Sequence, residues 1–307
     1  MTIGVILNQM GVILIFLLIG FWAKRSGRID VHGTKTLSWL IVNICGPALI
    51  VASVLSAEEL PDRMTAIKGI GLVFCLYVFL ILLGCVMGRL CLAPKADWNY
   101  FNAMSVFGNV GFLGIPLASA IFGNVATIYM TMFALAYNVL FYTYGYSKLR
   151  PADGPAQKFS FKLFINPGAI AALLAMVFLF TRIQVPLIIS EAFRYSGSAV
   201  TFLSIFVIGA NLSDVKIKDL LCHRQNILFV VIRQLLVPIA VVLVLKSFVT
   251  DPLMIGAIGI GVAVPVGNTN SMVAELNGCD LTALTEVTVL TTFLCVVTMT
   301  VVLLFVI

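Results

Sequence analysis

Three asparagines lie inside apolar stretches that glycine and proline interrupt, and their side-chain amides could bind an anion. Asn109 belongs to Gly108-Asn-Val-Gly-Phe-Leu-Gly-Ile-Pro-Leu117, and Asn268 and Asn270 belong to Ala263-Val-Pro-Val-Gly-Asn-Thr-Asn-Ser271. In a membrane helix such residues predict a break, which is tolerated only where protein or a water-filled cavity surrounds it. The half-helix after a break presents unpaired N–H groups, which attract negative charge. Two breaks that meet at mid-membrane would therefore form a site for a carboxylate or another anion.

The candidate site residues form three sets. Substrate contacts are predicted at Asn109, Val110, Asn268, Asn270, Asn43, Tyr137 and Asn138. The breaks are predicted to contain Gly108, Gly111, Pro116, Pro265 and Gly267, with Pro116 opening a half-helix over 116–122 and the residues 268–270 capping another over 271–277. Thr269 and Ser271 could instead hold a sodium ion. The alternative role of these asparagines is to satisfy backbone groups freed by the breaks.

Arg233 is the one basic residue predicted to lie well inside a span, and Glu286 is the main acidic candidate within a span. Arg233 could bind an anion or pair with Glu286, or its side chain could extend to the nearby cytoplasmic surface. Glu286 could pair with Arg233, carry a proton or face the membrane interface. Both histidines fall in predicted loops, where solvation is expected.

The composition indicates a membrane protein with no room for a soluble domain. Hydrophobic residues make up 61% of the 307 residues and charged residues 10%, whereas soluble domains carry about 25% charged residues. The predicted fold is all-α with ten membrane spans, at 3–22, 37–56, 67–91, 98–122, 124–146, 163–181, 193–210, 226–248, 252–278 and 281–306.

The net charge of +6 does not indicate nucleic acid, because the basic residues lie in short loops between spans. Thirteen of the 19 Lys and Arg residues fall in one set of alternate loops and five in the other, with Arg233 in a span. The richer set is predicted to be cytoplasmic, which places both termini outside the cytoplasmic membrane. The seven cysteines contain no CxxC pair, so neither a disulfide framework nor a metal site or cofactor is expected.

The chain is predicted to be an inverted repeat. The polar segment 149–162 separates five spans in 1–148 from five in 163–307, and an odd number inverts the second half. A shift of 155 positions aligns Gly123 with Gly278 and brings the two breaks into register. Matched breaks at a repeat interface are typical of secondary transporters.

The motif Gly108–Leu117 resembles the fourth span of the auxin efflux carrier family, whose bacterial members include malonate and other carboxylate permeases. Gly46-Pro47, Arg233 with Pro238, and Val264-Pro265 extend the resemblance along the chain. It implies a fold similar to sodium/bile acid symporters, with crossing broken spans 4 and 9. Scaffold spans 1, 2, 6 and 7 would form a homodimer contact, and spans 3–5 and 8–10 an elevator-like transport domain. It also places Asn109 at a substrate-contacting position. Gly267-Asn-Thr-Asn270 departs from the plant pattern, so auxin is not the expected substrate.

The sequence thus predicts a secondary transporter of a small organic anion in the lipid bilayer. Facilitated movement driven by the membrane potential and sodium- or proton-coupled symport both stay open, and a channel is a more distant alternative. An intramembrane enzyme is disfavoured because no histidine or aspartate lies deep in a span and no HExxH motif occurs.

Overall fold

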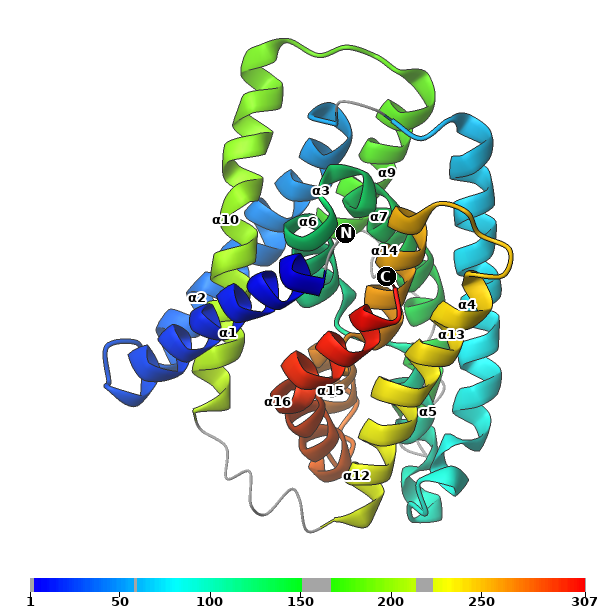
Figure 1. Cartoon of the computed structure of the whole chain (residues 1–307). Coiled ribbons are helices and arrows are strands. Elements are labelled where there is room, and N and C mark those ends of the chain that lie inside the picture. The colour runs from blue at the N-terminus through cyan, green and yellow to red at the C-terminus, as the bar shows by residue number, and fades with distance from the viewer. Residues whose placement is uncertain (1–2, 58–59, 151–166, 214–222, 307) are drawn as a thin grey trace.

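The computed structural model describes residues 3–57, 60–150, 167–213 and 223–306 (Figure 1). These residues form helices and contain no strand beyond one isolated bridge. The all-α class is therefore confirmed. Most of the predicted linker 149–162 lies outside the described residues. The main helices are α1 (Ile3–Arg25), α2 (Val31–Leu40), α3 (Gly46–Leu55), α4 (Arg63–Leu90), α5 (Trp98–Val106), α6 (Ile115–Phe122), α7 (Asn124–Leu140), α9 (Pro167–Thr181), α10 (Leu187–Leu212), α12 (Arg224–Phe229), α13 (Val237–Leu245), α14 (Pro252–Ala263), α15 (Asn268–Leu276) and α16 (Thr282–Leu304).

Six continuous helical runs in the described part of the chain are long and apolar enough to cross a membrane. These runs cover Val31–Leu55, Arg63–Leu90, Asn124–Lys148, Leu187–Leu212, Arg224–Leu245 and Thr282–Leu304. Shorter apolar helices cover Val110–Phe122, Pro167–Thr181 and Pro252–Ala263. A multi-pass membrane protein is the class that fits. The ten spans and their inverted repeat stay predictions.

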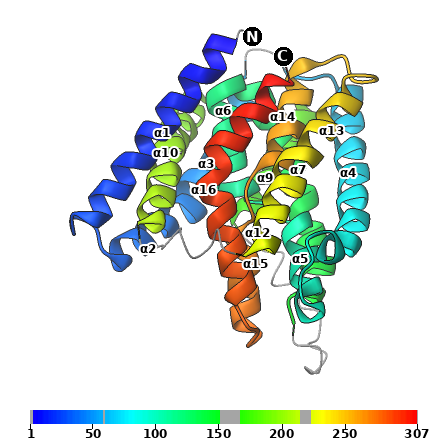
Figure 2. The same cartoon turned by 60° about the horizontal axis from the view of Figure 1, so that its bottom comes forward.

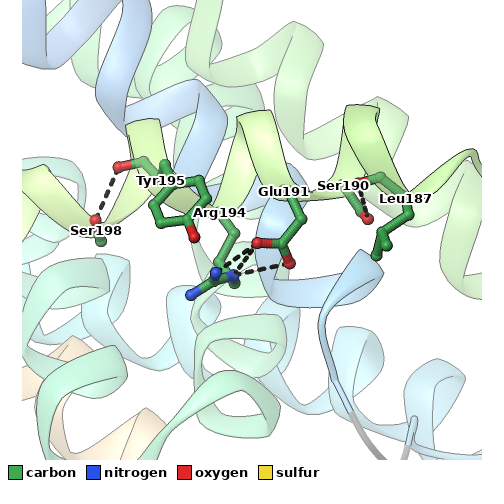
Figure 3. A network of polar contacts seen from close by, with 6 residues as sticks. All are labelled: Leu187, Ser190, Glu191, Arg194, Tyr195 and Ser198. Carbon is green, nitrogen blue, oxygen red and sulfur yellow. Dashed lines mark hydrogen bonds and ion pairs between the residues drawn. The ribbon is translucent and has the colours of Figure 1, made fainter.

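Two helices begin six residues earlier than hydropathy alone predicts. α2 starts at Val31 rather than 37 because the Asp30 side chain accepts a hydrogen bond from the Gly33 N–H at 2.7 Å and so caps the first turn. α10 starts at Leu187 rather than 193, directly after Pro186. Its first turn is apolar and exposed, and the following turns carry polar side chains: Arg194 pairs with Glu191 at 2.5 Å and lies over the Tyr195 ring (Figure 3). None of the residues in Figure 3 lines the cavities described below.

Prolines shape the interruptions inside the helices. The wide π-helical turns η1 (Ile41–Cys45), η3 (Val110–Gly114) and η6 (Val230–Leu236) each come directly before a helix whose second residue is proline, namely Pro47, Pro116 and Pro238. Proline has no N–H, and its ring clashes with the carbonyl one turn earlier. Widening the preceding turn relieves that clash, and such turns are frequent at functional sites.

Figures 1 and 2 show two groups of helices. α1, α2 and α10 lie on one side, and α4, α5 and α13 lie on the other. α1 begins and α16 ends at the same end of the molecule in Figure 2. α1 and α10 pack at very short range, because a Cβ at Gly20 would lie 2.0 Å from the Phe206 carbonyl oxygen and one at Gly209 would lie 2.0 Å from that of Leu17. Glycine at both positions lets the two backbones touch.

Candidate functional site

Two interrupted helices meet in the middle of the molecule. α5 ends at Val106 and α14 ends at Ala263, and helical structure resumes at Val110 in η3 and at Asn268 in α15. The extended links between them pair antiparallel at Gly108 and Val266. The Asn109 N–H donates to the Pro265 carbonyl at 2.7 Å, and the Gly267 N–H donates to the Phe107 carbonyl at 3.1 Å. Each link thus satisfies backbone groups that the other break has freed.

Close contact between the links requires glycine. A Cβ at Gly267 would lie 3.0 Å from the Gly108 carbonyl oxygen, and a Cβ at Gly108 would lie 2.6 Å from Cγ2 of Val264. A larger residue at either position would push the two breaks apart.

The second half-helices begin earlier than predicted. α15 starts at Asn268 instead of 271, so the three polar residues 268–270 form its first turn. On the other side, the Asn109 Oδ1 accepts from the Phe112 N–H at 3.2 Å and caps η3, while Pro116 lies within α6. Because Gly108 pairs with Val266, both helix N-termini start within two residues of the paired links. Some of their first N–H groups have protein partners, since the N–H of Val110 donates to the Gly108 carbonyl at 2.9 Å and that of Asn270 to the Gly267 carbonyl at 3.0 Å. The positive ends of the two helix dipoles nevertheless lie close together.

A cavity of about 560 Å³ opens beside these N-termini. Its wall on one side comes from α2, η1, α3, α9 and α10, and on the other from the links, η3, α6, α7 and the start of α15. Of the predicted site residues, Gly108, Asn109, Val110, Gly111, Asn43, Tyr137, Asn138, Asn268 and Thr269 line it. Most of the remaining lining is apolar, including Trp39, Phe112 and Ile208.

A smaller pocket of about 100 Å³ shares Asn109, Asn211 and Asn268 with the larger cavity and adds Thr288 and Thr292 of α16. Asn211 was not predicted. It lies one residue beyond the predicted span 193–210, whereas α10 continues to Leu212. The sequence feature that could have identified Asn211 is an amide at the end of an apolar run, but the predicted span ended at residue 210 and left Asn211 in a loop.

Asn270 supports the paired links from within. Its side chain is fully buried, and its Nδ2 donates to the carbonyls of Phe107 at 2.8 Å and Gly267 at 2.9 Å. It lines neither cavity, and neither do Pro116, Pro265, Gly267 or Ser271. These residues shape the site from behind its surface.

The two predicted charge candidates also lie outside the cavities. Arg233 is 3% exposed and donates to the backbone carbonyls of Ser105 and Val262. Glu286 accepts from the Asn226 Nδ2 at 2.9 Å and lies 2.7 Å from the His223 Nδ1. Among the described residues, no ion pair joins Arg233 to Glu286.

The chemistry of the cavity is that of neutral donors. Its described lining contains amides, hydroxyls and helix N-termini, with no Asp, Glu, Lys, Arg or His. Within the part of the chain that the structure describes, no three His, Cys, Asp or Glu residues gather as metal ligands would. Outside the spans, the Asp62 carboxylate caps α4, and hydrogen bonds from Thr65 lower its pKa. Hydrogen bonds from Thr282 lower the pKa of Asp280, which lies two residues before α16.

Residues 5–303 match the family described as "Membrane transport protein", which confirms the resemblance to the auxin efflux carrier family. The chain is 22% identical over 214 residues to an uncharacterized transporter of Methanocaldococcus jannaschii, covering 67% of this chain and 69% of that protein. It is 21% identical over 215 residues to a protein of Rhizobium meliloti named "Putative malonate transporter", covering 66% of each.

Proposed function

We propose, for a chain that belongs to the membrane transport protein family, a secondary transporter that moves a small organic anion of the carboxylate class. The observation that carries the proposal is the convergence of two half-helix N-termini beside a cavity of about 560 Å³. Each terminus bears roughly half a positive charge. The malonate named for the Rhizobium relative is a carboxylate and supports the same class.

In this proposal the carboxylate lies between Asn109 and Asn268. Asn109 has its Oδ1 committed to the Phe112 N–H, so its Nδ2 can face the ligand. Asn268 is exposed at the cavity and opens α15. Neutral donors aimed at a fixed point bind an anion without a buried cation, because hydrogen bonds to charged groups are worth about 1.5–3 kcal/mol each. The apolar lining would accept the remainder of the molecule.

Alternating access is proposed to occur by an elevator-like motion. The cavity lies between α2, α3 and α10 on one side and the paired links with α7 on the other. If the second group moves as one body, it carries the anion across the barrier formed by the first. The proposal also keeps ten spans in two inverted repeats, both termini outside a cytoplasmic membrane, and a homodimer through the scaffold helices.

Facilitated movement without a coupling ion is the mode the lining favours. The described lining has no carboxylate or histidine that could carry a proton. The membrane potential supplies about 2.3 kcal/mol per charge at 100 mV. Of the two residues suggested for sodium, Thr269 lines the cavity and Ser271 does not.

Counterflow in proteoliposomes tests the proposal. Vesicles loaded with unlabelled carboxylate should transiently accumulate the same labelled compound in a saturable way, for at least one of acetate, malonate, succinate and phenylacetate. Replacing sodium by potassium should leave the rate unchanged. Non-saturable flux would indicate a channel, and no flux of the four from folded protein would overturn the carboxylate class.

A further inference from the structure

Arg233 is a buried charge whose partners are backbone carbonyls. It lies in η6 and is 3% exposed. Its Nε donates to the Ser105 carbonyl and its Nη1 to the Val262 carbonyl. Ser105 and Val262 are the penultimate residues of α5 and α14. One guanidinium thus contacts the C-terminal ends of both α5 and α14, the two helices that end at the breaks.

This placement balances charge behind the breaks. The C-terminus of a helix carries roughly half a negative charge, concentrated on its last unpaired carbonyls. Two such ends amount to about one negative charge, which a single guanidinium offsets. No ion pair joins Arg233 to a carboxylate of the described residues, and none is needed to neutralise it. On the cavity side no acidic side chain of the described lining offsets the positive N-termini, so they are available to an anion.

The next residue of η6 makes a second attachment. Gln234 is 1% exposed, and its Nε2 donates to the Thr291 carbonyl of α16 at 2.8 Å. The Thr291 Oγ1 in turn accepts from the N–H of Val266, the residue paired with Gly108, at 3.2 Å. Two consecutive side chains of one widened turn therefore fix both helix ends and one of the paired links. A π-helical turn makes this possible by changing which successive side chains face the breaks.

We propose that Arg233 is a positioning residue that sets the geometry of the anion site from behind, through the backbone, without contacting the anion. It lines neither cavity. The inference about the site rests on the proposed function, whereas the bracing of the two breaks does not. Loss of the guanidinium should leave two facing carbonyl ends unpaired in a region without water, so the paired links should open locally.

Hydrogen exchange measured by mass spectrometry on the full-length protein in detergent tests the brace. In Arg233→Met, exchange should rise about tenfold or more in peptides that contain the Asn109 and Gly267 amides. Peptides from α1 and α10 should be unchanged. Arg224→Met is the matched control, because Arg224 is an exposed arginine on the preceding helix of the same run. Unchanged exchange at the links, or a uniform rise along the chain, would overturn the inference.

Conservative variants keep the test informative if Arg233→Met does not fold. Arg233→Lys retains the charge but replaces the planar guanidinium, whose N–H donors are fixed in direction, by a single ammonium group. It should therefore keep part of the protection from hydrogen exchange at the links, and Arg233→Gln should keep less. The same variants are titrated with malonate in a thermal-shift assay. If malonate does not raise the unfolding temperature of the wild-type protein, and exchange at the links still rises in Arg233→Lys, malonate is excluded as the ligand and the brace is supported. A variant whose links exchange faster but that binds malonate with wild-type affinity would contradict the positioning role.

Discussion

At the scale of single residues, the site combines amides that face the cavity with an amide that does not. Asn109 and Asn268 line both the large and the small pocket, whereas Asn270 is fully buried against the Phe107 and Gly267 carbonyls. Residue type and spacing could predict that all three lie near a break. They could not predict which amide faces the cavity, because that depends on α15 starting at Asn268.

The Asn109 amide has two consequences that a substitution can separate. Asn109→Ala removes one donor to the proposed anion, so affinity for a transported carboxylate should fall roughly 10- to 100-fold, as expected for a hydrogen bond to a charged group. It also removes the cap on the Phe112 N–H, which should cost about 0.5–2 kcal/mol of stability. Asn124→Ala is the control for affinity, because Asn124 lies outside both cavities and its Nδ2 donates to the Ser56 carbonyl at 3.0 Å, away from the proposed anion. Ligand titration by thermal shift would read out both effects, and unaltered affinity in Asn109→Ala would remove this residue from the site.

Glycines at the breaks should differ sharply in their tolerance of a methyl group. In Gly267→Ala the new Cβ would lie 3.0 Å from the Gly108 carbonyl oxygen, so the midpoint of thermal unfolding should drop. Gly111→Ala should be neutral, since a Cβ there meets no atom within 4 Å. Scanning fluorimetry of the two variants compares them directly, and equal midpoints would argue against the close pairing of the links.

At the scale of helices, hydropathy located most elements, and the predicted starts at 98, 124 and 252 agree with α5, α7 and α14, but α2 and α10 each begin six residues before the predicted start. The Asp30 cap starts α2 in a polar segment that hydropathy does not identify as part of a span. The α10 helix begins directly after Pro186 with an apolar turn over 187–189, which Ser190 and Glu191 separate from the predicted span. The interruptions could be predicted from Gly and Pro. Their form could not, because a proline can kink a helix, end it or widen the preceding turn, and neighbouring helices decide among these outcomes.

Packing between α1 and α10 offers a test at this scale. Gly20→Ala would force its Cβ to within 2.0 Å of the Phe206 carbonyl oxygen, so the two helices must separate and the protein should unfold at a lower temperature. Gly11→Ala on the same helix meets nothing within 4 Å. It should be neutral or slightly stabilising, because alanine has the higher helix propensity by about 1 kcal/mol. A Gly20→Ala protein as stable as the Gly11→Ala protein would contradict the observed helix contact.

At the scale of the whole molecule, composition and charge distribution fixed the class early, and the comparison with known families placed the chain among membrane transporters. What lay beyond sequence was the cavity, since its walls come from helices far apart in the chain, such as α3 and α10. Asn211 illustrates the difficulty. Its role is visible only once α10 and the paired links are seen to share two pockets.

Orientation in the membrane can be measured with exposed serines in opposite loops. The excess of Lys and Arg predicts that the loop containing Ser26 is cytoplasmic and the loop containing Ser247 is external. A membrane-impermeant maleimide applied to intact cells should therefore label Ser247→Cys and spare Ser26→Cys. The reverse pattern would place the termini in the cytoplasm.

The measurement that tests the central claim most directly is ligand protection of a thiol at the convergence of the two helix N-termini. Asn268→Cys should react with maleimide through the cavity, and a carboxylate that gives counterflow should slow that reaction in a saturable way. Thr282→Cys, exposed at the start of α16, should react at the same rate with and without the ligand. Unchanged labelling of Asn268→Cys at concentrations that saturate counterflow by this same variant would contradict an anion site between the broken helices.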